Sequence, residues 1–214
     1  MSEEFIREVD EDLRHHQLAS LWKKYGKYVI AVAVAIVLFV AATQGYKKYT
    51  ESKYLDVASQ YAAALENIES GNQQQAMAVL SALSDKDVPG YEILSAMKQA
   101  ELHLQNGDKS LAVGVLDKMS KNTDIGDFYR DLASLQAATI LMDEATYEET
   151  TARLEPLLER GNQMRYLARE LLAMSAIQNG DIEKARGLLR DLSEDLETPE
   201  QVKFRADQLI TVIE

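Results

Sequence analysis

Residues 98–119 read KQAELHLQNGDKSLAVGVLDKM, and their pattern indicates how the whole chain folds. At its centre, Asn106-Gly107-Asp108 offers a glycine that can take a positive φ and end one helix, followed by an aspartate that can cap the next. Apolar residues recur at helical spacing on both sides of this turn. The stretch therefore predicts two antiparallel helices joined by a tight turn.

The same turn recurs along the chain. Ser70-Gly71-Asn72 and Asn179-Gly180-Asp181 repeat it, and Ala145 takes the glycine position in a further unit, which gives spacings of 36, 38 and 35 residues. At fixed distances from the turn stand four columns: Ala64, Ala100, Ala138 and Ala173; Ala76, Ala112, Thr150 and Ala185; Leu80, Leu116, Leu154 and Leu189; and Leu83, Met119, Leu157 and Leu192. We expect these columns to form the core of stacked helix pairs, because one pair alone cannot bury its apolar face.

A second feature is the uncharged run from Tyr28 to Tyr46, YVIAVAVAIVLFVAATQGY. As a helix it spans roughly the 30 Å of a bilayer's hydrocarbon core. Its flanks carry side chains that the membrane interface favours: Trp22, Lys23, Lys24, Lys27 and Tyr28 on one side, and Tyr46, Lys47 and Lys48 on the other. These residues are our predicted interface anchors, and residues 28–46 are the predicted transmembrane helix.

Two other interpretations compete with an anchor: a buried core helix, and a signal peptide cleaved near Val40-Ala41-Ala42. The preceding residues 1–27 carry six acidic and five basic residues, unlike the short basic start of a signal peptide. We therefore favour an uncleaved anchor. The domains are then an amphipathic tail at 1–27, the anchor at 28–46 and a helical-repeat domain at 47–214.

Composition excludes several classes of function. The chain has no cysteine, so disulfides and thiolate metal sites are excluded. Residues 47–214 carry 29 acidic and 18 basic residues, an excess that disfavours binding to nucleic acid. Motifs for phosphate loops, serine nucleophiles and zinc proteases do not occur. His15 and His16 point to different faces of a helix, and His103 is expected to be packed or at the surface. We expect no enzyme, cofactor, metal site or small-molecule substrate.

Over residues 53–193 the pattern resembles the tetratricopeptide repeat, a helix pair of about 34 residues with small residues where its helices touch. Departures are Gln60, Ala96, Ser134 and Arg169 in place of the usual aromatic residue, and Pro156, which should break a helix. The resemblance implies an all-α solenoid of about four degenerate pairs, closed by a helix after Pro199. Carrying over the concave positions of such repeats gives a partner groove, with burial in the core as the alternative for each residue: Tyr61, Leu65, Met97, Glu101, Leu135, Thr139, Glu170 and Met174.

The order of tail, single span and degenerate repeats also resembles the YfgM-like family of bacterial inner-membrane proteins. The segment FIREVDEDLRHHQLASLWKKYGKYVI, residues 5–30, is similar to alphaproteobacterial members of that family. This resemblance implies an ancillary subunit of the Sec translocon whose repeats lie in the periplasm. It also implies cooperation with a membrane-anchored periplasmic chaperone and contact with unfolded client chains.

The alternative is a regulator with the same anchor and repeats, in which a cytoplasmic repeat domain recruits a protease or an envelope-biogenesis enzyme. Basic residues near the span separate the two interpretations. Arg14, Lys23, Lys24 and Lys27 precede it, and Lys47, Lys48 and Lys53 follow it. The excess before the span favours a cytoplasmic N-terminus and therefore repeats in the periplasm.

Overall fold

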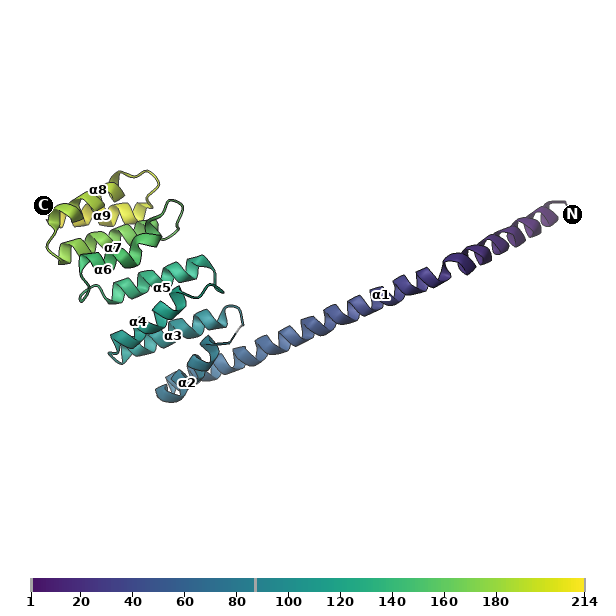
Figure 1. Cartoon of the computed structure of the whole chain (residues 1–214), viewed down its shortest axis with the longest axis horizontal. Coiled ribbons are helices and arrows are strands. Elements are labelled where there is room, and N and C mark those ends of the chain that lie inside the picture. The colour runs from purple at the N-terminus through teal and green to yellow at the C-terminus, as the bar shows by residue number, and fades with distance from the viewer. Residues whose placement is uncertain (1, 87, 214) are drawn as a thin grey trace. The chain divides into compact units, whose positions relative to one another are not determined.

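The computed structural model describes the backbone of residues 2–86 and 88–213, and the side chains of residues 21–86 and 88–213. Within these ranges the secondary structure is helical and contains no strand, so the predicted all-α fold class is confirmed (Figure 1). The chain divides after Leu55 into two compact units. Most of the predicted amphipathic tail, including His15 and His16, falls on residues 1–20, whose side chains lie outside the described residues.

The first unit is built from helix α1, Ser2–Glu69, whose last turns belong to the second unit. Among the described residues, α1 is one helix that is long and apolar enough to cross a membrane, and its apolar segment is not buried in the protein. This finding is compatible with a membrane anchor or with a signal sequence. All eight predicted interface residues are exposed on α1, and the Lys27 ammonium lies 5.1 Å from the centre of the Tyr28 ring.

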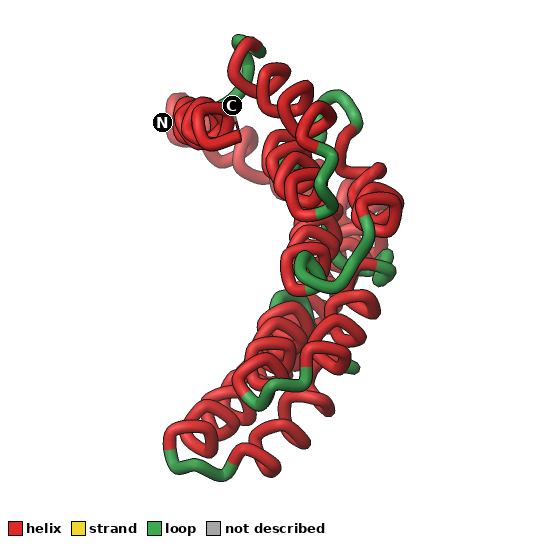
Figure 2. Tube along the Cα trace, turned by 90° about the vertical axis from the view of Figure 1, so that its left-hand side faces the viewer, coloured by secondary structure: helices red, strands yellow, loops and turns green. Residues whose placement is uncertain are grey.

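The second unit stacks short helices in chain order, and Figure 2 shows them following one another along a curved path. After the end of α1 come α2 (Gln73–Ser84), α3 (Tyr91–Gln105), α4 (Lys109–Ser120), α5 (Asp127–Ile140), α6 (Tyr147–Leu154), the 3₁₀ turn η1 (Glu155–Leu158), α7 (Arg165–Gln178), α8 (Ile182–Glu194) and α9 (Glu200–Ile213). Buried clusters join α1 to α3, α3 to α5, α5 to α7 and α7 to α9. Contacts therefore run between neighbours, as in a solenoid.

The core contains all of the columns that the spacing predicted. Every one of their sixteen residues is at most 5% exposed. Alanine at positions such as Ala64 and Ala173 lets the helix axes approach, and leucine at positions such as Leu80 and Leu189 fills the space between them. The polar member of the columns, Thr150, is buried in α6 and accepts a hydrogen bond from the Ser175 hydroxyl of α7 at 3.3 Å.

The predicted turn glycines take the backbone conformation that their positions require. Gly71, Gly107 and Gly180 have φ values of 79°, 82° and 80°. The predicted capping is correct at Asp181, whose side chain accepts a bond from the Lys184 N–H at 3.1 Å. It is wrong at Asn72 and Asp108, because there only the backbone carbonyl accepts bonds from the following helix.

Alanine substitutions at two glycines, Gly107 and Gly114, should change the stability in opposite directions. Gly107→Ala should lower the free energy of unfolding by about 1–2 kcal/mol, because a side chain at φ 82° is strained. Gly114→Ala should raise it by up to about 1 kcal/mol, since Gly114 lies inside α4 and a Cβ there meets nothing within 4 Å. Urea unfolding followed by circular dichroism measures both. The same sign for both variants would contradict this interpretation.

Candidate partner-binding groove

The first helices of the pairs, which are the end of α1, α3, α5 and α7, carry the main candidate site. A groove of about 550 Å³ lies over the first three of them. We call it the A-helix groove, and it is lined by Tyr61, Leu94, Met97, Lys98, Ala100, Glu101, Leu104, Leu116, Gln136, Thr139 and Ile140. Its volume is in the range of pockets that hold small ligands or segments of a partner chain.

Four of the eight residues predicted to face a partner line this groove. They are Tyr61 from α1, Met97 and Glu101 from α3, and Thr139 from α5. The Tyr61 ring packs edge-on against Tyr91, with 5.8 Å between the ring centroids. These four residues come from three helices, so stacking of the pairs brings together positions that lie far apart in the sequence.

The other four predicted residues lie elsewhere. Leu65 is half-buried outside the groove lining, and half-buried Leu135 packs against the core cluster that joins α5 to α7. Met174 is 40% exposed on α7. Glu170, also on α7, is buried and does not lie on the open surface.

Glu170 is held by the C-terminal helix. The Arg205 guanidinium of α9 donates to both of its carboxylate oxygens, with distances of 2.5 and 2.6 Å. This hydrogen bonding raises the pKa of Arg205 above its ordinary value. Helix α9 thus covers the position on α7 that corresponds to Met97 on α3.

Leu94 and Leu104 are apolar residues of the groove that were not among the predicted positions. They are 47% and 39% exposed, and both lie on α3 with Met97 and Glu101. The four residues follow one another at intervals of three, four and three, so they form one stripe on a helix. Extending the predicted i, i+4 pair along that stripe in both directions would have found the two leucines.

The groove has charged side chains but little net charge. The Lys98 ammonium lies 2.7 Å from a carboxylate oxygen of Glu101, and the Gln105 amide donates to the other oxygen at 3.1 Å. Because these charges pair within α3, the groove offers mainly leucine, methionine and tyrosine surface to a ligand. Such a surface binds apolar side chains, with methionine adapting to varied shapes.

A second depression, of about 400 Å³, lies over α2, α3 and α4. Its lining includes the apolar side chains of Ile93, Met119 and Ile125, and His103 is half-buried at this site. The buried Gln99 amide donates to the Leu80 carbonyl at 3.2 Å, so it ties α3 to α2.

Among the described side chains, no group of three or more histidine, cysteine, aspartate or glutamate residues could hold a metal ion.

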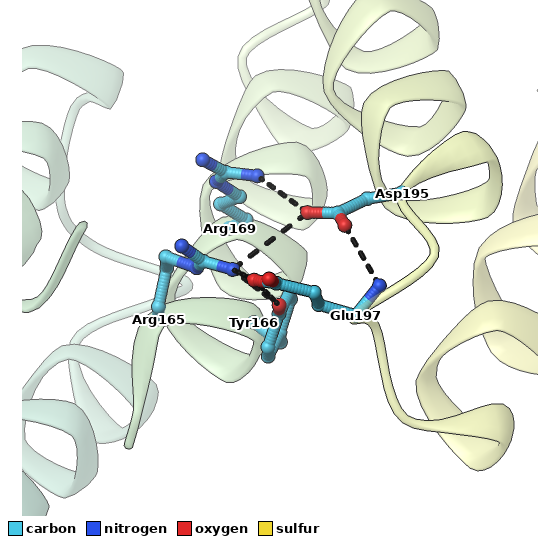
Figure 3. Close-up of polar contacts among 5 residues, drawn as sticks. All are labelled: Arg165, Tyr166, Arg169, Asp195 and Glu197. Carbon is cyan, nitrogen blue, oxygen red and sulfur yellow. Dashed lines mark hydrogen bonds and ion pairs between the residues drawn. The ribbon is translucent and has the colours of Figure 1, made fainter. Parts of the chain in front are cut away.

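A polar cluster fastens the connection between α8 and α9 to the start of α7 (Figure 3). The buried Arg165 guanidinium donates to the Tyr166 hydroxyl and, at 3.1 Å, to Glu197. Asp195 lies between Arg165 and Arg169, at 3.7 and 3.8 Å, and accepts a bond from the Glu197 N–H. The bond to Tyr166, followed by that to Glu197, raises the pKa of Arg165. The two arginines and the two carboxylates neutralise one another's charge. We therefore assign the cluster a role in holding the fold together.

Comparison with known proteins places the fold in a family. Residues 20–187 match the family described as tetratricopeptide repeat-like domain. The match begins before the predicted anchor, so it includes the anchor as well as most of the predicted repeat region at 53–193. No curated protein and no solved structure matches the chain. Because the match covers well over half of its length, this chain belongs to the tetratricopeptide repeat-like domain family.

Proposed function

We propose that this protein is a membrane-anchored scaffold that binds protein partners in the A-helix groove. The observation that carries the proposal is the groove itself, in which Leu94, Met97 and Leu104 offer apolar surface within about 550 Å³. Soluble proteins rarely leave contiguous apolar surface open unless it binds something. Membership of the tetratricopeptide repeat-like family supports the same role, because solenoids use their curved surfaces for binding.

The anchoring part of the proposal rests on α1. Its uncharged segment is exposed along its length, which is costly in water and favourable in lipid. Aromatic residues with nearby lysines stand at both ends of this segment, as in helices that cross a bilayer. We therefore propose that residues 28–46 cross the inner membrane once and remain in the mature protein.

The location and partners are proposed from the resemblance to the YfgM-like family. On this proposal the repeats lie in the periplasm beside the Sec translocon. They act with a membrane-anchored periplasmic chaperone on newly translocated chains. No catalytic step is assigned to the protein, because its proposed role requires only binding and positioning.

The location is tested with single cysteines, since the chain has none of its own. Asn72→Cys, in the turn between α1 and α2, should react in intact cells with a maleimide that crosses only the outer membrane. Ser2→Cys, at the other end of α1, should react only after lysis. The reverse pattern would place the repeats in the cytoplasm and favour recruitment of a protease or an envelope-biogenesis enzyme. The binding role is tested by placing glutamate residues in the A-helix groove. Partner binding should then be lost.

A further inference from the structure

The third helix pair is connected differently from the others. In the pairs α1–α2, α3–α4 and α7–α8, a three-residue turn with a positive-φ glycine reverses the chain. Between α5 and α6 the connection takes six residues, 141–146, with Ala145 in the glycine position. Thr146 then begins α6 with a capping box to Glu149, whose pKa is lowered by hydrogen bonds from the Thr146 N–H and hydroxyl. The two helices are thus joined by a longer connection.

The second helix of this pair is short and ends in a 3₁₀ turn. Helices α2 and α4 each have 12 residues, whereas α6 ends after eight and continues as the 3₁₀ turn η1. Pro156 causes the change, because it has no N–H to donate to the carbonyl four residues earlier. Hydrogen bonds of a 3₁₀ turn have poorer geometry, so η1 holds the end of this helix less firmly than a further α-helical turn would.

Packing in this pair is also looser. Helices α5 and α6 contact each other less extensively than α3 and α4 or α7 and α8. An open depression of about 330 Å³ lies over α6 and the connection that precedes it, lined in part by the small side chains of Ala138, Ala145 and Thr150. The adjoining core includes Met142 and Met164, whose flexible side chains tolerate rearrangement.

Polar contacts join the third pair to its neighbours on both sides. Arg153 of α6 donates to both carboxylate oxygens of Asp117 in α4, and Lys109 lies 3.1 Å from Glu144. On the other side of the third pair, the Gln178 amide of α7 donates to the Asp143 carboxylate, in the connection between α5 and α6, at 3.0 Å. Partly exposed contacts of this kind contribute little stability each, so they limit movement without locking the helices.

From these observations we propose that α6 and η1 form a hinge between two rigid stacks of helices. The N-terminal stack contains the end of α1 and α2–α5, and the C-terminal stack contains α7–α9. The hinge is a property of the fold and does not depend on the proposed binding function. Its effect is to change the separation between the groove leucine Leu94 on α3 and the exposed Met174 on α7.

The test measures distances by electron paramagnetic resonance between pairs of spin-labelled cysteines in the full chain in detergent. One pair, at Ser110 and Gln208, spans the hinge. Two control pairs lie within single stacks, at Gln74 and Ser110 and at Arg190 and Gln208. All four positions are exposed. The pair that spans the hinge should show a broader distance distribution than either control pair.

Pro156→Ala tests the cause of the movement. Alanine lets α6 continue through η1, so the distribution across the hinge should narrow toward the control width. Pro89→Ala is the matched control, because Pro89 is exposed in a loop of the N-terminal stack, and it should change nothing. A distribution across the hinge as narrow as the controls would overturn the proposal. So would a broad distribution that Pro156→Ala leaves unchanged.

Discussion

Replacing Leu116 with alanine is expected to lower the free energy of unfolding by about 2–5 kcal/mol, the largest effect on stability that we predict. Leu116 is 1% exposed and lies in the core shared by α3, α4 and α5. Its truncation removes apolar contact with α3 and α5. It also leaves a cavity that the surrounding helices fill only in part. Because each pair is stabilised by its neighbours, the loss also weakens the stack on both sides.

The matched control is Leu111→Ala, on the same helix. Leu111 is 52% exposed, so its truncation should change the free energy of unfolding by no more than about 0.5 kcal/mol. Urea titration of the full chain in detergent, followed by circular dichroism, gives the midpoint and slope for both variants. Equal losses at Leu111 and Leu116 would show that the repeat spacing does not identify the core.

Placing glutamate at Leu94 and Leu104 together should reduce partner binding at least about tenfold, which corresponds to about 1.4 kcal/mol. Both leucines line the A-helix groove, and a partner seated there would have to cover two added carboxylates, while the lysine of the groove lining, Lys98, is already paired with Glu101. The two side chains are exposed in the free protein, so the charges can reach water and the helices should remain folded. The measurement is the yield of photo-crosslinking in cells from Met97 to subunits of the proposed partner, the Sec translocon.

The control places the same two charges on the other face, as Ala78→Glu on α2 with Leu111→Glu on α4, both of which are exposed. This variant should keep the full crosslinking yield. Helicity should match the wild type in both variants. An unchanged yield with Leu94→Glu and Leu104→Glu would remove the groove from the proposed function. Leu135 is a poor choice for such a test, since it packs against the core and a charge there would destabilise the domain as well.

Local pattern predicted the elements of this fold well, because each requirement falls on one residue or one helix. A turn that needs positive φ selects glycine, which identified Gly71, Gly107 and Gly180. A break in the α-helical hydrogen bonds follows from Pro156 alone, and the structure places the 3₁₀ turn there. Side-chain capping at Asn72 and Asp108 was predicted wrongly. A side chain that is able to accept a hydrogen bond from the first helical turn does not have to do so.

The groove was predicted only in part, because exposure on a helix depends on its neighbours. Met97 and Glu170 occupy equivalent repeat positions, yet one lines the groove and the other is covered by Arg205 from α9. Their own sequence context does not distinguish them, since the covering residue lies 35 positions away. Leu135 and Leu104 show the same limit, the first half-buried against the core and the second exposed.

The helices, the turns, the buried columns and the apolar segment of α1 could be predicted from the sequence, since periodicity and backbone preference are local properties. Tertiary packing determines which leucines remain open, where the groove lies and where the stack is loosely packed. These features depend on contacts between residues about one repeat apart, such as the 36 residues between Asp117 and Arg153 and the 31 between Asp131 and Asn162. Such contacts exist only once the helices have packed, because each helix leaves open what its neighbours do not cover.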